Sequence, residues 1–264
     1  MTSLKTIASV TLSVLTLGSI GQQQVYMVNG WGDLYTVDLG TCASTLIGNT
    51  GLSVFDIAYC PASGLLYGVT EYSELCIIDL TDASVEFVGY TDFILNALVC
   101  DELGTLYAAC QYDDAIYTVD ALTGTISLVG STCTGLVSGG DLTFYNGELY
   151  WSTASNELVQ VNLQAPCASE VVGAFGGVGD VFGIVSVLDC AQNVYVSSGS
   201  SFHLLDMTTL GTTTQCAWIV PGGINGAASS TETVTEPALQ PTGPFCQTDP
   251  ATALPVSVTG GTWS

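Results

Sequence analysis

Short runs of apolar residues alternate with polar turn residues along most of the chain. After residue 21, runs of four to six residues rich in Val, Ile, Leu, Tyr and Phe are separated by Gly, Asp, Ser and Thr. Runs of this length and composition, bounded by turn residues, are typical of β-strands. The spacing of apolar residues that marks an amphipathic helix is absent after residue 21. The pattern therefore predicts an all-β protein.

The strand pattern repeats with a period near 41 residues. One strand in each repeat ends at an Asp or Asn, and these anchor residues are 41, 41, 42 and 44 positions apart. The five anchors are Asp38, Asp79, Asp120, Asn162 and Asp206. Because short polar side chains commonly hydrogen-bond the backbone of a following turn, we expect the anchors to cap turns.

Two further markers keep the same period. A glycine ends the last strand of the first four repeats, and a tyrosine lies in the second strand of all five. The glycines are Gly48, Gly89, Gly130 and Gly173, and the tyrosines are Tyr26, Tyr67, Tyr107, Tyr150 and Tyr195. We expect the tyrosines to pack between neighbouring repeats.

Each repeat contains four predicted strands, which we label A, B, C and D. Four antiparallel strands in about 40 to 45 residues form one blade of a β-propeller. The chain begins with strands B, C and D of the first repeat, continues through four complete repeats and ends with one A-like strand at 223–229. We therefore predict a five-bladed propeller whose C-terminal strand completes the first blade and leaves no open edge. An open or six-bladed ring, the alternative, would need a repeat that this sequence does not contain.

The two ends of the chain differ from the repeats. Residues 1–21 combine a polar start containing Lys5, an apolar run and small residues, which is the pattern of a cleaved secretory signal. Residues 22–230 would then form the propeller. Residues 231–244 are rich in Thr and Pro and predict an extended linker. Residues 245–264 contain too few strands to bury their own apolar residues, so we expect the truncated start of a further domain.

The repeat motif and the tail each resemble known families. The strand LYTVD, the turn Thr123-Gly124 and the strand LVG resemble uncharacterised secreted propellers built from LYxVD…TG…VG repeats, over about residues 25–230. The tail FCQTDPATALPVSVTGGTWS is similar to the start of Ig-like repeats in large surface proteins of gliding bacteria that use type IX secretion. The resemblance implies a module of a multidomain exported protein and no agreed activity.

The charge of the chain is strongly one-sided. The sequence has 24 Asp and Glu residues, one Lys and no Arg, which gives a formal charge of −23. A surface without cations repels nucleic acids and anionic membranes, so neither is an expected partner. With 48% hydrophobic residues, the chain does not belong to the disordered class. We expect a secreted protein, extracellular or at the cell surface, that is stabilised by added salt or Ca²⁺.

Ten cysteines in an exported chain indicate disulfides rather than a metal site. The sequence contains no CxxC pair and one isolated His, which argues against structural zinc. From their positions in the repeat we expect the pairs Cys190–Cys216, Cys42–Cys60 and Cys110–Cys133. Ten cysteines allow hundreds of connectivities, so other pairings stay open.

The loops between strands B and C carry the first candidate site. Antiparallel strands place all B–C loops, and the D–A connections between blades, on one side of the ring, which we call the B–C face. Four of these loops place an acid before strand C and three place an aromatic residue two positions earlier. The residues are Trp31, Asp33, Tyr72, Glu74, Tyr112, Asp114 and Glu157. Aromatic and carboxylate groups together suit a sugar ring, although a solvated rim has the same composition.

A second candidate site lies on the same face, where the A strands begin near the axis. The aligned polar residues there are Asp56, Asn96, Asp141 and Asn225, with Gly183 in the fifth blade. Converging carboxylate and amide oxygens are the ligands that Ca²⁺ prefers. The alternative is a set of repeated turns in which these side chains bond their own backbone.

The sequence favours recognition over catalysis. It contains no GxSxG or HExxH motif, and His203 lies alone on a C strand, so we name no catalytic residue. We expect a non-catalytic recognition or adhesion module of a larger secreted or cell-surface protein, with a glycan or a surface protein as ligand. The alternatives are a glycan-active hydrolase that uses carboxylates on the same face and a purely structural spacer.

Overall fold

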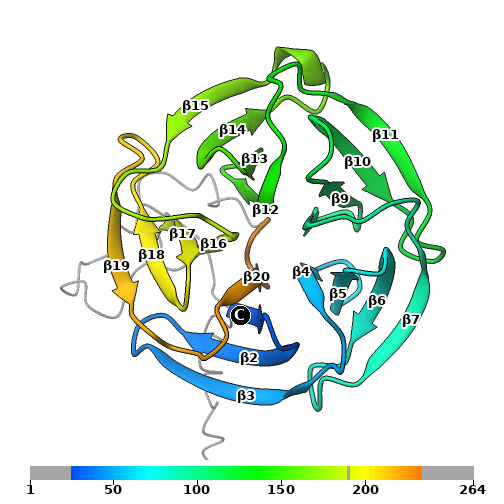
Figure 1. The fold of residues 1–264 in the computed structure, drawn as a ribbon, viewed down its shortest axis with the longest axis vertical. Helices are drawn as coiled ribbons and strands as arrows, with labels where there is room; N and C mark the ends of the chain where they lie inside the picture. The colour runs from blue at the N-terminus through cyan, green and yellow to red at the C-terminus, as the bar shows by residue number, and fades with distance from the viewer. Residues whose placement is uncertain (1–24, 189–190, 234–264) are drawn as a thin grey trace, which may run out of the picture.

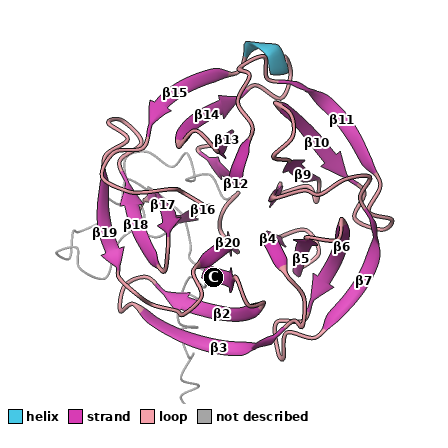
Figure 2. Ribbon diagram, in the orientation of Figure 1, coloured by secondary structure: helices cyan, strands magenta, loops and turns pink. Residues whose placement is uncertain are grey.

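Five antiparallel sheets of four strands each form the blades of a ring (Figures 1 and 2). The structure is a computed structural model that describes residues 25–188 and 191–233. The A strands of neighbouring blades contact one another around the central axis, and the D strands lie at the rim. The prediction of an all-β, five-bladed propeller is therefore confirmed.

The strands follow the order A to D from the axis outward in every blade. Blade 1 consists of β20 (Ile224–Ser229), β1 (Val25–Asn29), β2 (Asp33–Asp38) and β3 (Ala43–Asn49). Blade 2 consists of β4 (Val54–Cys60), β5 (Leu65–Thr70), β6 (Glu74–Ile78) and β7 (Val85–Tyr90). Blade 3 consists of β8 (Ala97–Cys100), β9 (Leu106–Ala109), β10 (Ala115–Val119) and β11 (Ile126–Ser131).

The remaining two blades have the same arrangement, with one short helix added. Blade 4 consists of β12 (Ser138–Tyr145), β13 (Glu148–Thr153), β14 (Glu157–Val161) and β15 (Glu170–Ala174), with the 3-10 helix η1 (Pro166–Ala168) between its C and D strands. Blade 5 consists of β16 (Gly183–Leu188), β17 (Gln192–Ser198), β18 (Ser201–Leu205) and β19 (Thr212–Cys216).

The ring closes by pairing the two ends of the propeller sequence. Strand β20 lies antiparallel to β1, with Val25 opposite Ser229 and Met27 opposite Ala227. Blade 1 thus takes strands B, C and D from the N-terminal part and strand A from the C-terminal part, as the strand count predicted. The closure removes the unpaired edge that an incomplete first blade would expose.

The apolar core consists of five clusters, one at each interface between neighbouring blades. The repeated tyrosines lie in these clusters, as predicted. Tyr26 of blade 1 stacks on Tyr59 of blade 2 with ring centroids 6.0 Å apart. Tyr107 of blade 3 meets Phe144 of blade 4 edge-on at the same centroid distance, 6.0 Å. Aromatic packing across interfaces therefore helps to fix one blade against the next.

The repeated glycines mark the places where strand D of one blade meets the C–D turn of the next. A Cβ atom on Gly89 would overlap the carbonyl oxygen of Thr123, and one on Gly48 would overlap that of Asp82. The same position in each blade carries a β-bulge, so that Gly89 lies opposite Leu75 while Phe87, two residues earlier, lies opposite Cys76. The glycine is thus required by close backbone approach rather than by the turn itself.

The five anchors cap the turns that follow strand C, as predicted. The Oδ1 atom of Asp120 accepts hydrogen bonds from the backbone N–H groups of Leu122 and Thr123 at 2.9 and 3.0 Å. The other anchor Asp residues make the same type of bond. In blade 4, the amide oxygen of Asn162 replaces the carboxylate and accepts bonds from the next turn at 3.1 and 2.9 Å. An amide oxygen therefore suffices for this role.

Three disulfides join neighbouring blades. They are Cys42–Cys216 between blades 1 and 5, Cys60–Cys100 between blades 2 and 3, and Cys133–Cys167 between blades 3 and 4. The predicted pairs Cys42–Cys60, Cys110–Cys133 and Cys190–Cys216 are therefore wrong. Among the described residues, Cys76 and Cys110 are free thiols, and both are buried.

The physical reason for two of these pairings is the contact between each D strand and the next C–D segment. That contact brings Cys216, at the end of β19, to Cys42 in the C–D turn of blade 1, with Cα atoms 5.3 Å apart. It brings Cys133, just after β11, to Cys167 in η1 in the same way. Cys60 and Cys100 each end strand A in adjacent blades, where their Cα atoms are 5.0 Å apart.

Three of the predicted segments lie mostly outside the described residues. These are the signal at 1–21, the tail at 245–264 and the linker at 231–244, of which the structure describes only 231–233.

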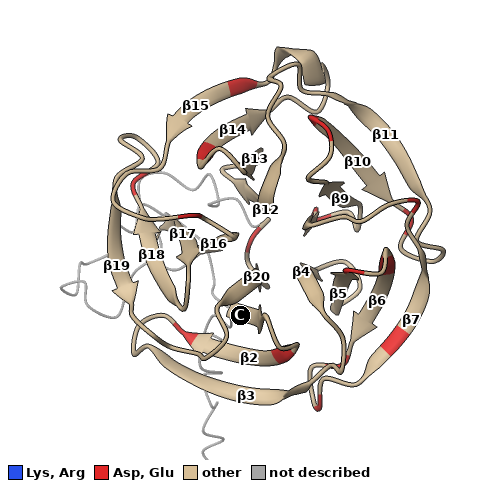
Figure 3. Ribbon diagram, viewed as in Figure 1, with Lys and Arg blue, Asp and Glu red and all other residues tan. Residues whose placement is uncertain are grey.

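Asp and Glu are spread over all blades, and the described residues contain no Lys or Arg (Figure 3). Within the same residues, no helix is long and apolar enough to span a membrane.

Candidate ligand-binding face

The B–C face is built from pairs of loops that are bonded together within each blade. In each blade, a backbone carbonyl of the B–C turn accepts a hydrogen bond from the segment that follows strand D. These bonds run from Thr50 to Gly32, Thr91 to Ser73, Thr132 to Asp114, Phe175 to Asn156 and Ile219 to Ser200, with lengths of 2.7–3.0 Å. The face is therefore a regular, backbone-bonded platform around the axis.

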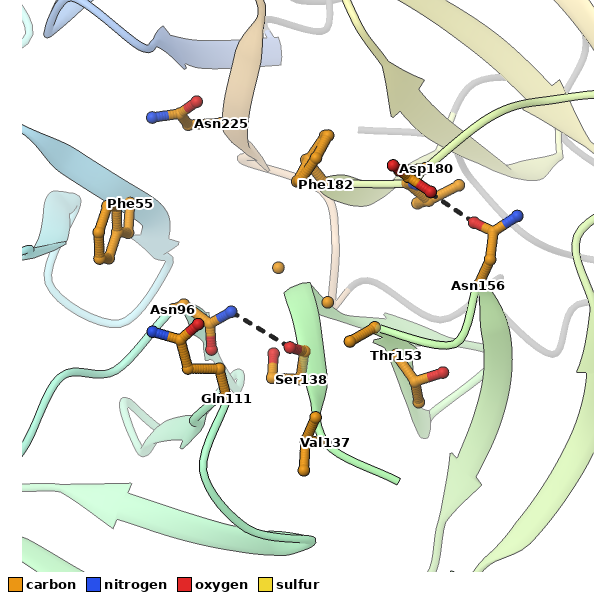
Figure 4. A pocket seen from close by; sticks show the side chains of 14 residues that line it. Phe55, Asn96, Gln111, Val137, Ser138, Thr153, Asn156, Asp180, Phe182 and Asn225 are labelled. Carbon is orange, nitrogen blue, oxygen red and sulfur yellow. Dashed lines mark hydrogen bonds between the residues drawn. The ribbon is translucent and has the colours of Figure 1, made fainter. Parts of the chain in front are cut away.

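A pocket of about 490 Å³ opens at the centre of this face (Figure 4). It lies where the A strands begin, and its walls come from blades 1 to 5. The side chains that line it include Phe55, Asn96, Gln111, Ser138, Thr153, Asn156, Asp180, Phe182 and Asn225. A pocket of this size, lined by aromatic rings and a few polar groups, is typical of small-ligand sites.

Two residues that line the pocket each carry a buried polar atom without a hydrogen-bond partner. The Oγ atom of Ser138 is buried and unpaired, and so is the Oδ1 atom of Asn96. The two residues are held together, because the Nδ2 atom of Asn96 donates to the Ser138 carbonyl at 3.4 Å. Buried polar atoms are normally bonded, so an unpaired pair in the wall of a pocket indicates a place for a partner.

The three predicted aromatic residues on the B–C loops are highly exposed. Trp31, Tyr72 and Tyr112 expose 63%, 66% and 62% of their surface. The Trp31 ring covers Gly222, where a Cβ atom would lie 3.0 Å from the ring. None of the three lines the pocket, although Gln111, which does, donates a hydrogen bond to the Tyr112 hydroxyl at 3.2 Å. The loop aromatics thus form a rim outside the pocket.

The predicted loop acids mainly organise their own loops. Asp33 accepts bonds from the side chains of Asn29 and Asn49 at 3.0 and 2.6 Å. The Oε2 atom of Glu74 accepts a bond from the Thr70 hydroxyl at 3.0 Å.

The other two loop acids lie in blades 3 and 4. Asp114 accepts bonds from Ser131 Oγ and the Gly135 N–H at 2.8 and 3.2 Å. The Glu157 carbonyl accepts a bond from Thr153 Oγ1 at 3.0 Å, and the Glu157 N–H donates one to the same hydroxyl at 3.2 Å. Like the aromatics, none of the four acids lines the pocket.

The predicted metal ring divides into two layers. A β-bulge leaves Phe55 in blade 2 and Asn225 in blade 1 without a partner on strand B. Asp56 is therefore equivalent to Gly226 rather than to Asn225. In blade 3 the equivalent residue is Ala97, one position after Asn96. Asn96 and Asn225 therefore line the pocket, whereas Asp56 and Asp141 lie one residue deeper.

The two deep carboxyl groups link neighbouring A strands. Asp56 accepts bonds from the N–H groups of Ile57, in its own blade, and Leu98, in the next blade, at 2.8 and 2.6 Å. Asp141 does the same with Leu142 and Ile184, at 2.6 and 2.9 Å. Both side chains are fully buried. These bonds give the two Asp residues a structural role at the axis.

Burial raises the pKa of both carboxyl groups well above its usual range, because no cation compensates for their desolvation. The two carboxyl groups also interact with each other, so the pair retains a proton more readily than a solvent-exposed carboxyl group does. Among the described residues, no group of three or more His, Cys, Asp or Glu side chains is arranged to hold a metal ion. Calcium binding stays a prediction.

A third buried carboxyl group, Glu232, was not expected at the axis. The segment after β20, orange in Figure 1, runs toward blades 4 and 5. There Glu232 Oε1 accepts a bond from Thr143 Oγ1 at 2.5 Å, and its carbonyl accepts one from Gln192 Nε2 at 3.1 Å. Burial raises the pKa of Glu232 to about 8. The sequence around Glu232, residues 231–244, is rich in Thr and Pro and predicted a linker. The composition therefore gave no indication of this contact.

His203 makes one hydrogen-bond contact, with Thr214 Oγ1 at 3.2 Å, on the outer part of blade 5. Partial burial lowers the pKa of its imidazole, which favours the neutral ring. The residue does not line the pocket.

Comparison with known proteins identifies the fold and no family. No family model and no curated protein matches this chain. A chain in the crystal structure of a nidogen/laminin complex is similar over 79% of this chain and 98% of its own length, with a TM-score of 0.56 and 14% sequence identity. At this identity, the similarity establishes a propeller-type architecture alone.

Proposed function

We propose that this propeller is a non-catalytic recognition module of an extracellular or cell-surface protein and that it binds its ligand on the B–C face. The central pocket, with its two unpaired polar atoms, is the observation that carries the proposal. The three exposed aromatic side chains on blades 1, 2 and 3 add to it, because such residues contribute strongly to binding surfaces. Three disulfides fit an extracellular or secreted protein.

The charge of the chain restricts the ligand. With no Lys or Arg among the described residues, the face has no cation to pair with a phosphate, sulfate or carboxylate. The ligand is therefore neutral or cationic, which admits glycans and surface proteins. The nidogen/laminin structure is a complex of two proteins, which is in keeping with a protein ligand.

The carboxyl groups on this face support binding better than hydrolysis. A glycoside hydrolase needs two carboxyl groups that flank the substrate bond. Asp56 and Asp141 are fully buried beneath the pocket, and both bond to backbone N–H groups. Asp33, Glu74 and Asp114 bond to their own loops. Asp180 is the one acid that lines the pocket.

Arrays of glycans and of extracellular proteins test the proposal directly. The purified protein should bind a ligand, and the triple variant Trp31→Ala, Tyr72→Ala, Tyr112→Ala should bind it at least tenfold more weakly. The matched control replaces exposed apolar residues of the outer strands, Leu46→Ala, Phe87→Ala and Leu128→Ala, and should bind normally.

Three outcomes would count against this proposal. Binding that survives the loop variants but fails in the outer-strand control would move the ligand to the rim of the ring. Binding to nothing on either array would favour a structural spacer. Release of reducing sugar from a polysaccharide would favour the hydrolase.

A further inference from the structure

We propose that the central pocket of the B–C face binds one neutral sugar ring, held by Ser138 and Asn96 and packed against Phe55 and Phe182. This inference rests on the proposed function and narrows it to a site and a ligand class. The loop residues Trp31, Tyr72 and Tyr112 then contact the rest of the glycan outside the pocket.

The unpaired atoms on the pocket wall supply the polar half of the site. Ser138 is 2% exposed, and its Oγ can both donate and accept a hydrogen bond. The Oδ1 atom of Asn96 is an acceptor on the adjoining residue, fixed by the bond from its own Nδ2 to the Ser138 carbonyl. One acceptor beside one hydroxyl matches two neighbouring hydroxyl groups of a sugar, because each of those can donate and accept.

The two phenylalanines supply the apolar half. Figure 4 shows Phe55 and Phe182 on different walls of the pocket from the Asn96–Ser138 pair. Phe55 belongs to β4, and Phe182 directly precedes β16 and is 46% exposed. A sugar ring has an apolar face of C–H groups that packs on an aromatic ring, while its rim of hydroxyl groups needs polar partners. The pocket presents both kinds of surface.

The charge and size of the pocket select a neutral unit. Its other polar side chains include the amides of Gln111, Asn156 and Asn225, and Asp180 is its one ionisable residue. A uronic acid or a sulfated sugar would meet negative charge with nothing to offset it. A volume of about 490 Å³ lies within the range of pockets that bury small organic ligands.

Isothermal titration of the intact protein provides the test. The probes are neutral gluco-, galacto- and manno-oligosaccharides, a uronic acid oligosaccharide and an oligolysine peptide. We expect at least one neutral oligosaccharide to bind and the uronic acid oligosaccharide to fail. Phe182→Ala should weaken binding at least tenfold. Ser138→Ala should weaken binding severalfold without lowering the melting temperature, because the hydroxyl that it removes has no partner in the protein.

Two matched variants separate binding from folding. Ser197 Oγ is also buried and unpaired but does not line the pocket, so Ser197→Ala should leave binding unchanged. Phe87 is similarly exposed on the outer strand β7, so Phe87→Ala should also bind normally. If the two serine variants weaken binding equally, or if Phe182→Ala binds like the unaltered protein, the pocket is not the sugar site.

The outcomes also separate this inference from the proposed function. Binding of oligolysine that is lost in the variant Trp31→Ala, Tyr72→Ala, Tyr112→Ala, with no neutral oligosaccharide bound, would overturn the sugar site and leave the B–C face as a site for cationic proteins. Binding to a protein on the array, weakened by loss of Trp31, Tyr72 and Tyr112 and with no response to any saccharide, would likewise overturn the sugar site. It would leave the B–C face as a protein-binding site. Failure of every probe and every array would overturn both proposals.

Discussion

At the scale of single residues, the unusual feature is a set of buried carboxyl groups without a cation. Asp56, Asp141 and Glu232 are each less than 5% exposed. They are accommodated by hydrogen bonds, from backbone N–H groups to the two Asp residues and from Thr143 to Glu232. Burying ionised carboxylates without partners of opposite charge is costly, so the folded protein retains protons on this cluster.

This cluster predicts that the protein becomes less stable as the pH rises. Unfolded, Glu232 loses its proton near its usual value of 4.5, whereas in the folded protein its pKa is about 8. Between these values the unfolded chain binds fewer protons at Glu232, so the contribution of this residue to the free energy of unfolding falls as the pH increases and levels off above pH 8. The raised pKa values of Asp56 and Asp141 act in the same direction.

Urea unfolding across this pH range, in high salt to screen general repulsion, measures the effect. In Glu232→Gln the decline should be shallower, because an amide keeps most of the hydrogen bonding and does not titrate. Stability that is constant or rises with pH in the unaltered protein would contradict the account of these carboxyl groups.

At the scale of elements, each D strand contacts the C–D segment of the next blade. The contact explains both the repeated glycines and two of the three disulfides. The sequence repeat predicted the strands and the ring closure, because strand identity depends on local pattern. It did not predict the disulfide pairs, because these depend on how one blade packs against the next, through the outermost strand for two pairs and the innermost strands for Cys60–Cys100.

The sequence repeat likewise predicted only part of the candidate site. The repeat placed the B–C loops on one face, but the A strands of blades 1 and 3 pair one residue out of register with the sequence alignment, which separates Asn225 and Asn96 from the Asp pair. Phe55 and Phe182 each directly precede an aligned position, Asp56 and Gly183, and were not expected in a site for that reason. Glu232 gave no periodic signal, since it follows the last strand.

The glycine contact predicts that Gly89→Ala lowers the free energy of unfolding by about 1–3 kcal/mol. The added methyl group would overlap the Thr123 carbonyl, so blades 2 and 3 would have to separate slightly. Gly179→Ala is the control, because its Cβ atom would lie 3.5 Å from its nearest neighbour, Ser198 Oγ, which is an ordinary contact. Equal effects of the two variants in denaturant unfolding would show that the close approach is not required.

The disulfides close loops of different length, so removing each one should lower the free energy of unfolding by a different amount. Cys42 and Cys216 are 174 residues apart, whereas Cys133 and Cys167 are 34 apart. Loss of the longer-range bridge, in Cys42→Ser with Cys216→Ser, should cost about 1 kcal/mol more than loss of the shorter one, because it frees a longer loop in the unfolded chain. Denaturant unfolding of the two double variants gives the comparison, and the reverse ranking would argue against ring closure as the main constraint.

At the scale of the whole molecule, the dominant feature is the formal charge of −23. Uncompensated carboxylates repel one another across the surface, and this repulsion is screened by salt. The pocket and the exposed aromatic residues lie on one face of this acidic ring. The fold thus presents a pocket and exposed aromatic side chains in surroundings that disfavour anions.

The charge predicts that the melting temperature rises with NaCl concentration. CaCl₂ should raise it further than NaCl of the same ionic strength if Asn96, Asn225 or the deeper Asp residues contribute to a calcium site, and EDTA should reverse the additional rise. Equal effects at matched ionic strength would overturn calcium binding and leave screening alone. A melting temperature that does not respond to either salt would contradict both calcium binding and the screening of surface repulsion.

The most direct test of the central claim, that the B–C face is the ligand face, is an experimental structure of the protein with a ligand found in the binding screens. The account predicts ligand density on this face, with a sugar unit between Phe182 and Ser138. Density on the outer D strands, or on the opposite face near the C–D turns, would contradict it.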